Sequence, residues 1–306
     1  MTLLLIGGGF VALLLGGEAF VRGAVALATR LGLPPLVIGL TLVGFGTSLP
    51  ELLTSLQAAW DGAPGIAVGN VVGSNTANVL LILGAAAVMS PIVVDARTFR
   101  RDGAVLMIAS LATVAIVLSG EIGRAAGAVF VAALLGYVAV ALVSGRREGA
   151  GETVDAARMG LAPALGWTAA GLAGVLLGAR WLVAGAVDLA ASLGVSEAVI
   201  GVTVVAVGTS LPELVTSVVA ARRGESAVAF GNVVGSNVFN LLGILGITAL
   251  AVPLRIPDEI AAFDIWVMLG AAAILVAAAV SGWRITRAEG AAMLALYAGY
   301  LVWLAV

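Results

Sequence analysis

The segment GLTLVGFGTSLPELLTS, residues 39–55, places Glu51 in the middle of an otherwise apolar stretch of membrane-spanning length. A close copy, GVTVVAVGTSLPELVTS, occupies residues 201–217 and places Glu213 at the matching position, 162 residues later. A carboxylate near the middle of a bilayer is costly and by default marks an ion or proton pathway. Interrupted apolar segments at corresponding positions of two halves are the best sequence indication of a transporter's binding site. The two segments therefore predict a cation transporter.

A second pair of motifs follows at the same offset. Residues 69–84 read GNVVGSNTANVLLILG and residues 231–246 read GNVVGSNVFNLLGILG. Ser74 therefore matches Ser236, and Asn78 matches Asn240. Asn70, Ser74 and Asn78 recur every four residues, which places them on one face of a helix. Each half thus contributes a second helix with a polar face.

The composition indicates an all-α polytopic membrane protein. Of 306 residues, 61% are hydrophobic and only 10% are charged, and the mean hydropathy is +1.16. Soluble domains carry about 25% charged residues, so most of this surface is expected to face a lipid bilayer. The net charge of -2 gives no reason to expect a nucleic acid, and no protein partner is implied. The chain has no Cys, His or Lys, which argues against an enzyme built on a thiol or on a serine with its base.

Charge clusters and Pro/Gly turns divide the chain into ten predicted spans, two sets of five. We predict a first repeat at 1–143 with its motif region at 39–84, a short cytoplasmic linker at 144–160, and a second repeat at 161–306 with its motif region at 201–246. Because each half has an odd number of spans, the halves must be inverted relative to each other. The expected spans are 3–28, 35–59, 65–89, 103–119, 125–143, 162–190, 196–220, 226–250, 264–281 and 289–305.

The distribution of arginine sets the expected orientation. With both termini outside the cytoplasm, the inner loops carry eleven arginines and the outer loops only Arg124 and Arg255. Such a bias is the positive-inside rule. The N-terminal segment lacks the basic start of a signal peptide, and we expect it to be a retained first helix. The predicted location is the cell inner (plasma) membrane, crossed several times.

The duplicated segments supply only oxygen ligands. Pro50 has no amide hydrogen, so the carbonyl of Gly46 loses its helical donor, and Pro212 does the same for Gly208. Carboxylates, hydroxyls, amides and freed carbonyls suit Na⁺, Ca²⁺ or Mg²⁺ and are poor ligands for soft metals. Two glutamates match the charge of one Ca²⁺, and two or three Na⁺ would neutralise them to a similar degree. The residues expected on one stripe are Gly44, Thr47, Ser48, Glu51 and Ser55, repeated as Ala206, Thr209, Ser210, Glu213 and Ser217.

Each of these features also has a purely structural interpretation. Pro, small-residue pairs and Ser or Asn in membrane helices usually serve packing, and a single intramembrane Glu can be the partner of an Arg. The same pattern occurring twice, in halves of opposite orientation, favours a binding site. Glu18 and Arg22 are different: their i, i+4 spacing predicts a local ion pair.

The paired GTSLPE and GNVVGSN motifs resemble the α-repeats of the cation/Ca²⁺ exchanger superfamily, most closely its prokaryotic Na⁺/Ca²⁺ exchanger-like branch. The resemblance covers the whole chain. It implies that Glu51 and Glu213 hold Ca²⁺ together with the backbone carbonyls of Thr47 and Thr209, and that the first and sixth spans slide to alternate access. It also implies Na⁺ sites formed by Ser48, Ser74 and the carbonyl of Gly44, and by Ser210, Ser236 and the carbonyl of Ala206.

The chain departs from that family in one way that bears on the site. Some members carry Asp at the position of Asn78 or of Asn240, whereas this chain has Asn at both, which leaves the middle of the site less charged. We expect an antiporter that exchanges Ca²⁺ for Na⁺ and needs no cofactor. The alternatives are an H⁺-coupled Ca²⁺ antiporter, because the same glutamates can carry protons, and a channel.

Overall fold

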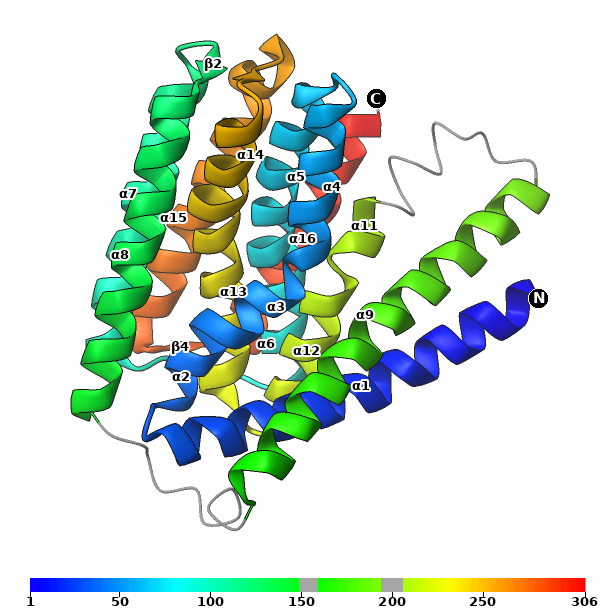
Figure 1. Cartoon of the computed structure of the whole chain (residues 1–306), viewed down its shortest axis with the longest axis vertical. Coiled ribbons are helices and arrows are strands. Elements are labelled where there is room, and N and C mark those ends of the chain that lie inside the picture. The colour runs from blue at the N-terminus through cyan, green and yellow to red at the C-terminus, as the bar shows by residue number, and fades with distance from the viewer. Residues whose placement is uncertain (149–158, 194–205, 306) are drawn as a thin grey trace.

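The computed structural model describes residues 1–148, 159–193 and 206–305, and almost all of them are helical. The helical elements of the first half are α1 (Thr2–Leu31), α2 (Pro35–Ile38), η1 (Gly39–Val43), α3 (Gly44–Thr47), α4 (Leu49–Trp60), α5 (Pro64–Ala77), η2 (Asn78–Leu83), α6 (Gly84–Met89), α7 (Ala96–Val117) and α8 (Arg124–Glu148). Those of the second half are α9 (Leu161–Ser192), α11 (Ala206–Thr209), α12 (Leu211–Arg222), α13 (Ser226–Val238), η5 (Phe239–Ile244), α14 (Leu245–Ala251), η6 (Ile260–Asp264), α15 (Ile265–Gly282) and α16 (Arg287–Ala305). Where both halves are described they show the same succession of helices, except that η6 before α15 has no counterpart before α7 (Figure 1).

Within these residues, six helices are long and apolar enough to cross a membrane, and one further pair is a helix bent by 43°. The bent pair joins Pro35–Thr47 to Leu49–Trp60. The prediction of an all-α polytopic membrane protein is therefore confirmed. Helices α7, α11 with α12, and α16 occupy the three remaining predicted spans. The beginning of the seventh predicted span, 196–220, lies outside the described residues.

Two spans form the centre of the bundle. In the continuous spans Pro64–Met89 and Ser226–Ala251, 78% and 89% of the apolar 18-residue stretch is buried inside the molecule. In the span that contains α8, the buried share is 28%. Both central spans contain a π-helical segment, η2 and η5, near the middle. π-helical segments are rare and occur frequently at functional sites. The sequence pattern did not predict these segments, because the spacing of apolar residues does not show where a helical turn contains one extra residue.

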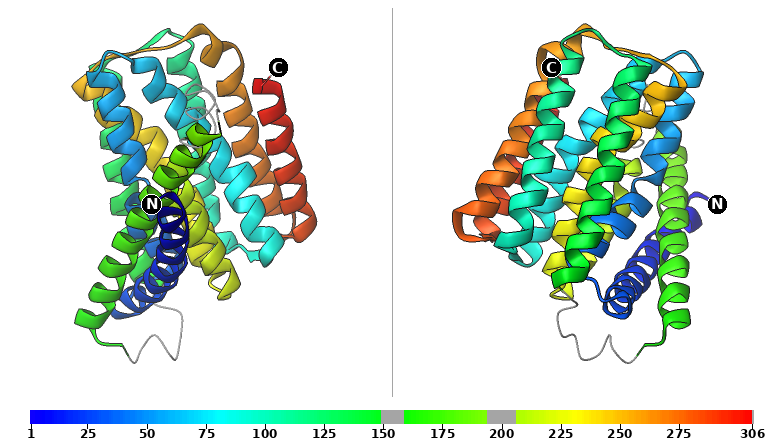
Figure 2. Two further views of the ribbon diagram at one scale, coloured as in Figure 1. Left: turned by 90° about the vertical axis from the view of Figure 1, so that its right-hand side faces the viewer. Right: turned by 60° about the vertical axis from the view of Figure 1, so that its left-hand side comes forward.

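Helices α1 and α9 form an antiparallel pair that crosses the other helices obliquely (Figures 1 and 2). Glycines make the close contact: a Cβ built at Gly16 would lie 2.6 Å from the amide nitrogen of Val175, and one at Gly178 would lie 2.6 Å from that of Leu13. Further close contacts of the same kind are made by Gly9, Gly23, Gly171 and Gly185. Small residues that let backbones approach are a main source of helix association in membranes. The two helices are therefore packed tightly against each other.

Two short antiparallel ladders join the halves. β1 (Ile92–Val93) pairs with β4 (Arg284–Ile285), and β2 (Glu121–Ile122) pairs with β3 (Leu254–Arg255). β1 and β3 are equivalent positions of the two repeats. Figure 1 shows β2 at the upper end of the bundle and β4 at the lower end, so the two ladders cap opposite ends.

The last helix of each half packs on the other half. Gly127 of α8 lies against Gly246, and Gly290 of α16 lies against Gly84, each so closely that an added Cβ would be within 3 Å of the partner's carbonyl oxygen. The first residue of each of these helices also contacts the other half. Arg124 donates to the carbonyl of Leu250 and Arg287 to that of Val88. The halves are therefore interlocked rather than side by side.

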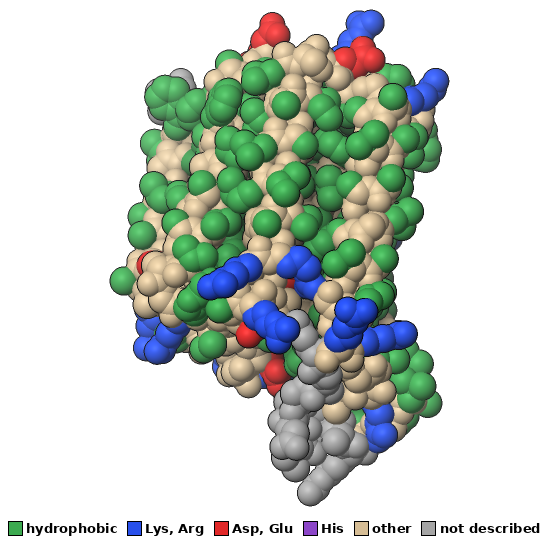
Figure 3. Space-filling view, turned by 90° about the vertical axis from the view of Figure 1, so that its left-hand side faces the viewer, with side chains coloured by type: hydrophobic (Ala, Val, Ile, Leu, Met, Phe, Trp, Pro, Cys, Tyr) green, Lys and Arg blue, Asp and Glu red, His purple; other side chains and the backbone are tan. Residues whose placement is uncertain are grey.

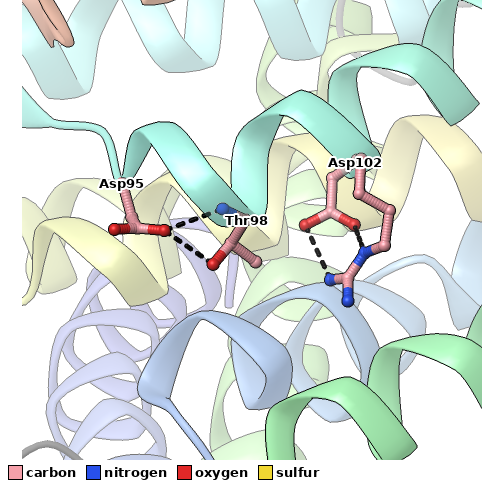
Figure 4. Close-up of polar contacts among 4 residues, drawn as sticks. Asp95, Thr98 and Asp102 are labelled. Atoms are coloured by element: carbon pink, nitrogen blue, oxygen red, sulfur yellow. Dashed lines mark hydrogen bonds and ion pairs between the residues drawn. The ribbon is translucent and has the colours of Figure 1, made fainter. Parts of the chain in front are cut away.

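Helix α7 begins at an aspartate cap (Figure 4). Asp95 accepts hydrogen bonds from the amide (2.8 Å) and the hydroxyl (2.6 Å) of Thr98. The Thr98 hydroxyl and amide lower the pKa of Asp95 below its ordinary value. Arg101 forms an ion pair with Asp102 at 2.7 Å one turn later. The cap explains why this helix starts at Ala96, earlier than the predicted 103.

One face of the molecule shows how charge is distributed (Figure 3). Hydrophobic side chains cover a wide belt, and basic side chains gather near the end where α7 begins and α8 ends. Fewer charged side chains lie at the opposite end of this face. This agrees with a lipid-facing belt and one basic membrane surface.

One local prediction is wrong. Glu18 does not pair with Arg22 but forms an ion pair with Arg223, at the end of α12. The guanidinium of Arg22 lies over the Trp167 ring of α9, 5.5 Å from its centroid. Sequence spacing could not reveal this, because both partners come from the other half of the chain.

Candidate cation site

Each duplicated segment breaks its helix immediately before the glutamate. Ser48, between α3 and α4, has φ -86° and ψ 8°, and Ser210, between α11 and α12, has φ -89° and ψ 5°. The glutamate follows in the first turn of the new helix. Peptide dipoles at a helix N-terminus stabilise a negative charge. Glu51 and Glu213 are each only 1% exposed, so both carboxylates are buried at the start of a helix.

Serines of one half contact glutamates of the other. The hydroxyl of Ser48 donates to Oε1 of Glu213 at 2.8 Å, and that of Ser210 donates to Oε1 of Glu51 at 3.4 Å. The second contact is longer than an ordinary O–H···O hydrogen bond. The two helix breaks therefore face each other, and the two glutamates belong to one site.

Two asparagines hold the new helices in place. Asn70 donates to the carbonyl of Glu51 (3.2 Å) and to the hydroxyl of Ser55 (3.0 Å). Asn232 repeats this with the carbonyl of Glu213 (3.2 Å) and the hydroxyl of Ser217 (2.8 Å). These bonds tie each central span to the neighbouring broken helix of its own half. They explain the asparagine at the start of each GNVVGSN motif.

Further contacts connect the first broken helix to the central span of the second half. Thr47 donates to the carbonyl of Val43 (3.0 Å) and also contacts Oδ1 of Asn232 at 3.2 Å. Ser236 donates to the carbonyl of Gly44 at 3.1 Å. A Cβ built at Gly44 would lie 2.9 Å from the amide nitrogen of Ser236, so a larger residue would separate these helices.

A group of asparagines lies on the central spans. Asn78, the first residue of η2, donates to Oδ1 of Asn237 at 3.1 Å. Asn240, in η5, is 1% exposed, and its amide nitrogen and oxygen both lack a hydrogen-bond partner. Asn75 donates to the carbonyl of Val71, and its own oxygen has no partner. Asn75 and Asn237 were missed as candidates, although the GSN motif contains them.

The remaining predicted residues are placed less fully. Ser74 is buried on α5, one turn before Asn78, and Thr209 is half-buried in α11. Ala206 begins α11, and its side chain is not among those described. The structure therefore gathers Glu51, Glu213, Ser48 and Ser210 through direct contacts, and it connects Thr47, Gly44 and Ser236 to them through neighbouring helices.

Several buried oxygens of this region have no hydrogen-bond donor. They include Oε2 of Glu51, Oε2 of Glu213 and Oδ1 of Asn78. Buried polar atoms are nearly always paired, so each exception requires an explanation. Among the described residues, no three or more Asp, Glu, His or Cys side chains lie close enough together to hold a metal ion by themselves. Two carboxylates with neutral oxygens around them form a ligand set suited to a hard cation that is bound and released.

A polytopic helical bundle with paired carboxylates at two facing helix breaks is the architecture of a membrane ion exchanger. The chain belongs to the sodium/calcium exchanger protein family. The sequence model of this family matches residues 1–143 and again residues 163–306. The match to each half separately agrees with the duplication seen in the sequence. The predicted family is confirmed.

Several similar proteins align with nearly the whole chain. The putative antiporter CaxA of Alkalimonas amylolytica is 36% identical over 95% of both chains. The sodium/calcium exchanger MaX1 of Methanosarcina acetivorans is 34% identical, covering 96% of this chain and 95% of the relative. The solved structure of the sodium-calcium exchanger NCX_Mj soaked with 10 mM Na⁺ and zero Ca²⁺ superposes with a TM-score of 0.87 at 33% identity and 99% coverage of both chains.

Proposed function

We propose that this protein is a secondary active antiporter that exchanges Ca²⁺ for Na⁺ across a membrane by alternating access. The observation that carries the proposal is the reciprocal contact of Ser48 with Glu213 and Ser210 with Glu51. Each contact brings the glutamate of one half to the helix break of the other, which supports a single buried cation site between the two halves. Two carboxylates match the charge of one Ca²⁺, and Na⁺ replaces it on the return step.

The ligand assignments are those that the family resemblance implies, and the contacts of Ser48 with Glu213 and of Ser210 with Glu51 support them. Ca²⁺ is bound by Glu51 and Glu213, with the carbonyls of Thr47 and Thr209. Na⁺ binds on either side of the Ca²⁺ position, and Asn78 and Asn240 provide neutral oxygens in the middle. The Na⁺ ligands are Ser48, Ser74 and the Gly44 carbonyl on one side, and Ser210, Ser236 and the Ala206 carbonyl on the other.

The membrane arrangement belongs to the same proposal. The chain has ten spans in two inverted five-helix repeats, 1–143 and 161–306, joined by the cytoplasmic linker 144–160. The position of the two ladders at opposite ends of the bundle supports the inversion. Both termini lie outside the cytoplasm, and the basic end faces inward. The 34% identical inner membrane protein YrbG of Escherichia coli supports an inner-membrane location.

Alternating access comes from the α1–α9 pair, which slides across the remaining helices as one body. Its close glycine packing and its oblique position support this role. The protein is a transporter rather than an enzyme, and it requires no cofactor and no protein partner. Coupling to H⁺ in place of Na⁺ is the second candidate, because the same two glutamates are able to carry protons.

Flux into proteoliposomes tests the proposal. Purified protein is reconstituted, and uptake of radioactive Ca²⁺ is measured with an outward Na⁺ gradient, an outward H⁺ gradient, or neither. We expect uptake driven by the Na⁺ gradient alone. Uptake driven only by the H⁺ gradient would establish the second candidate. Uptake that is the same under all three conditions would indicate a channel and contradict both.

A further inference from the structure

Four charged residues outside the cation site are related by the duplication. Glu18 of α1 and Arg180 of α9 occupy equivalent positions, 162 residues apart. Arg223, after α12, and Asp61, after α4, are equivalent by the same offset. In each half, one of these four residues lies on the first helix and the other lies directly after the broken helix. The signs are reversed between the halves, so Glu18 is complementary to Arg223 and Arg180 is complementary to Asp61.

The first of these pairs is formed. Glu18 and Arg223 make an ion pair that joins α1 to the end of α12. Next to it, Gly17 lies on Val215 and Val219 of α12. A Cβ built at Gly17 would be 2.9 Å from a methyl group of Val215. At the basic end of the molecule, α1 is therefore closed on α12.

The second pair is open. Arg180 and Asp61 are both exposed, and neither has an ion-pair partner among the residues that the structure covers. Asp61 instead accepts a hydrogen bond from Gln57 of its own helix at 2.9 Å. The face of α4 beside it is hollowed by a cavity of about 560 Å³, whose lining includes Leu53, Gln57 and Asp61.

The residues that line this cavity indicate which helix corresponds to it by the duplication. Leu53, Gln57 and Asp61 are the equivalents of Val215, Val219 and Arg223, the residues on which α1 rests. By the same offset, the equivalent of the covering residue Gly17 is Ala179 of α9. The cavity on α4 therefore corresponds to the surface of α12 that is already covered. Asp61 in its lining is opposite in charge to Arg180 of α9.

We infer that Arg180 and Asp61 form an ion pair in the opposite-facing state, in which α9 closes on α4 and the Glu18–Arg223 pair is broken. The inference rests on the proposed alternating access. Because α1 and α9 are packed as one body, closing one end opens the other, and the two pairs exclude each other. Both pairs lie on the surface of the molecule, with Asp61 and Arg223 directly after the ends of their helices, and surface ion pairs contribute little energy. They bias the two states without locking either one, as a cycling transporter requires.

Disulfide cross-linking tests this directly, since the natural chain contains no Cys. One double variant carries Glu18→Cys and Arg223→Cys, and the other carries Arg180→Cys and Asp61→Cys. Both are oxidised in membrane vesicles across a series of Na⁺ and Ca²⁺ concentrations. We expect both to cross-link, with opposite dependence on the cations. The matched control combines Trp181→Cys with Asp61→Cys, because the next helical residue points about 100° away, and it should cross-link far less.

A variant carrying all four cysteines tests the mutual exclusion. We expect each molecule to form one cross-link or the other, but not both. Absence of the Arg180–Asp61 cross-link under every condition, in samples where the Glu18–Arg223 pair cross-links, would overturn the inference. So would frequent double cross-linking in single molecules.

Charge reversal provides a second readout. Arg180→Glu should shift the balance of states toward the present one, by roughly 1.5-fold to fivefold for an exposed pair, and so increase Glu18–Arg223 cross-linking in that background. Adding Asp61→Arg should restore the original balance, and failure of this rescue would contradict the pair. Cross-linking does not depend on which ion is carried. Exclusive cross-links without Na⁺-driven Ca²⁺ flux would refute only the proposed function, and coupled flux without the Arg180–Asp61 cross-link would refute only this inference.

Discussion

Ser48 and Glu213 lie 165 residues apart in the chain, and the hydroxyl of Ser48 donates a 2.8 Å hydrogen bond to Oε1 of Glu213. The equivalent bond from Ser210 to Glu51 is 3.4 Å long. The two halves thus make the same contact, but one copy is tighter. This agrees with a molecule closed at one end and open at the other, as the formed Glu18–Arg223 pair and the unformed Arg180–Asp61 pair also indicate.

The serine contacts give the first prediction. Ser48→Ala leaves a buried carboxylate oxygen without its donor, at a cost of about 1–3 kcal/mol, and it removes a proposed Na⁺ ligand. We expect the Na⁺ concentration for half-maximal exchange to rise about tenfold, and Ser210→Ala to have a comparable or smaller effect. Ser110→Ala is the matched control, because Ser110 is equally buried but bonds only to the carbonyl of Leu106. Unchanged Na⁺ dependence of the Ser48→Ala protein would show that Ser48 is not a Na⁺ ligand.

Acid should inhibit transport by competition. Protons and Ca²⁺ require the same carboxylate oxygens, and Oε2 of Glu51 and of Glu213 have no hydrogen-bond donor. The chain has no His that could titrate nearby. Lowering the pH should therefore raise the apparent Ca²⁺ requirement while leaving the maximal rate unchanged. The measurement is Ca²⁺ uptake over a range of Ca²⁺ concentrations at several pH values. Inhibition that saturating Ca²⁺ does not relieve would argue against competition.

The third prediction concerns the unpartnered amide of Asn240. Since two glutamates are expected to suffice, Asn240→Ala should weaken cation binding less than loss of either glutamate. Asn240→Asp adds a buried negative charge, which must be offset by another cation or a proton. It should therefore change the Na⁺ gradient that balances a fixed Ca²⁺ gradient, or make that balance depend on pH. If Asn240→Ala were as inactive as Glu213→Gln, the amide would be a primary ligand and this ranking would be wrong.

The cap of α7 gives a prediction about stability. Asp95→Ala removes both bonds to Thr98 and should lower the free energy of unfolding by about 1 kcal/mol, whereas Asp95→Asn should retain most of it. Because the pKa of Asp95 is lowered in the folded protein, its contribution is complete above the unfolded value of roughly 3.9. It disappears as the pH falls through the lower folded value. Thermal unfolding in detergent measures this, with Asp258→Ala, an exposed aspartate, as the control. Equal stability of the alanine variant and the natural protein would contradict the cap.

Much of the fold and site could be predicted because the duplication repeats the informative residues. Glu51 and Glu213 stand out in apolar surroundings, and the Ser and Asn positions follow from their spacing. Asn237 was missed because it accepts from Asn78, the first residue of the π-helical η2, across the two halves, and the apolar pattern encodes neither the π-helical turn nor that contact. Asn75 was missed as well; its side chain donates to the carbonyl of Val71 within α5. The pairing of Glu18 with Arg223 was also missed, because it depends on how α1 crosses α12 in three dimensions. Local spacing finds residues on one helix face, but it does not show which helix lies opposite.

Glu51 and Glu213, one from each half, are proposed to bind the same Ca²⁺. Replacing either with Gln keeps the shape of the site and removes half of its charge, which leaves a dehydrated divalent cation under-compensated in a low-dielectric environment. The control is Glu121→Gln, which alters an exposed glutamate of β2.

The most direct measurement is equilibrium Ca²⁺ binding to purified, folded protein in detergent without Na⁺. We predict that the natural protein and Glu121→Gln bind Ca²⁺ with the same affinity, and that Glu51→Gln and Glu213→Gln each lose at least about 100-fold, or roughly 2.8 kcal/mol. Binding near the natural affinity by either Glu51→Gln or Glu213→Gln would contradict a shared site.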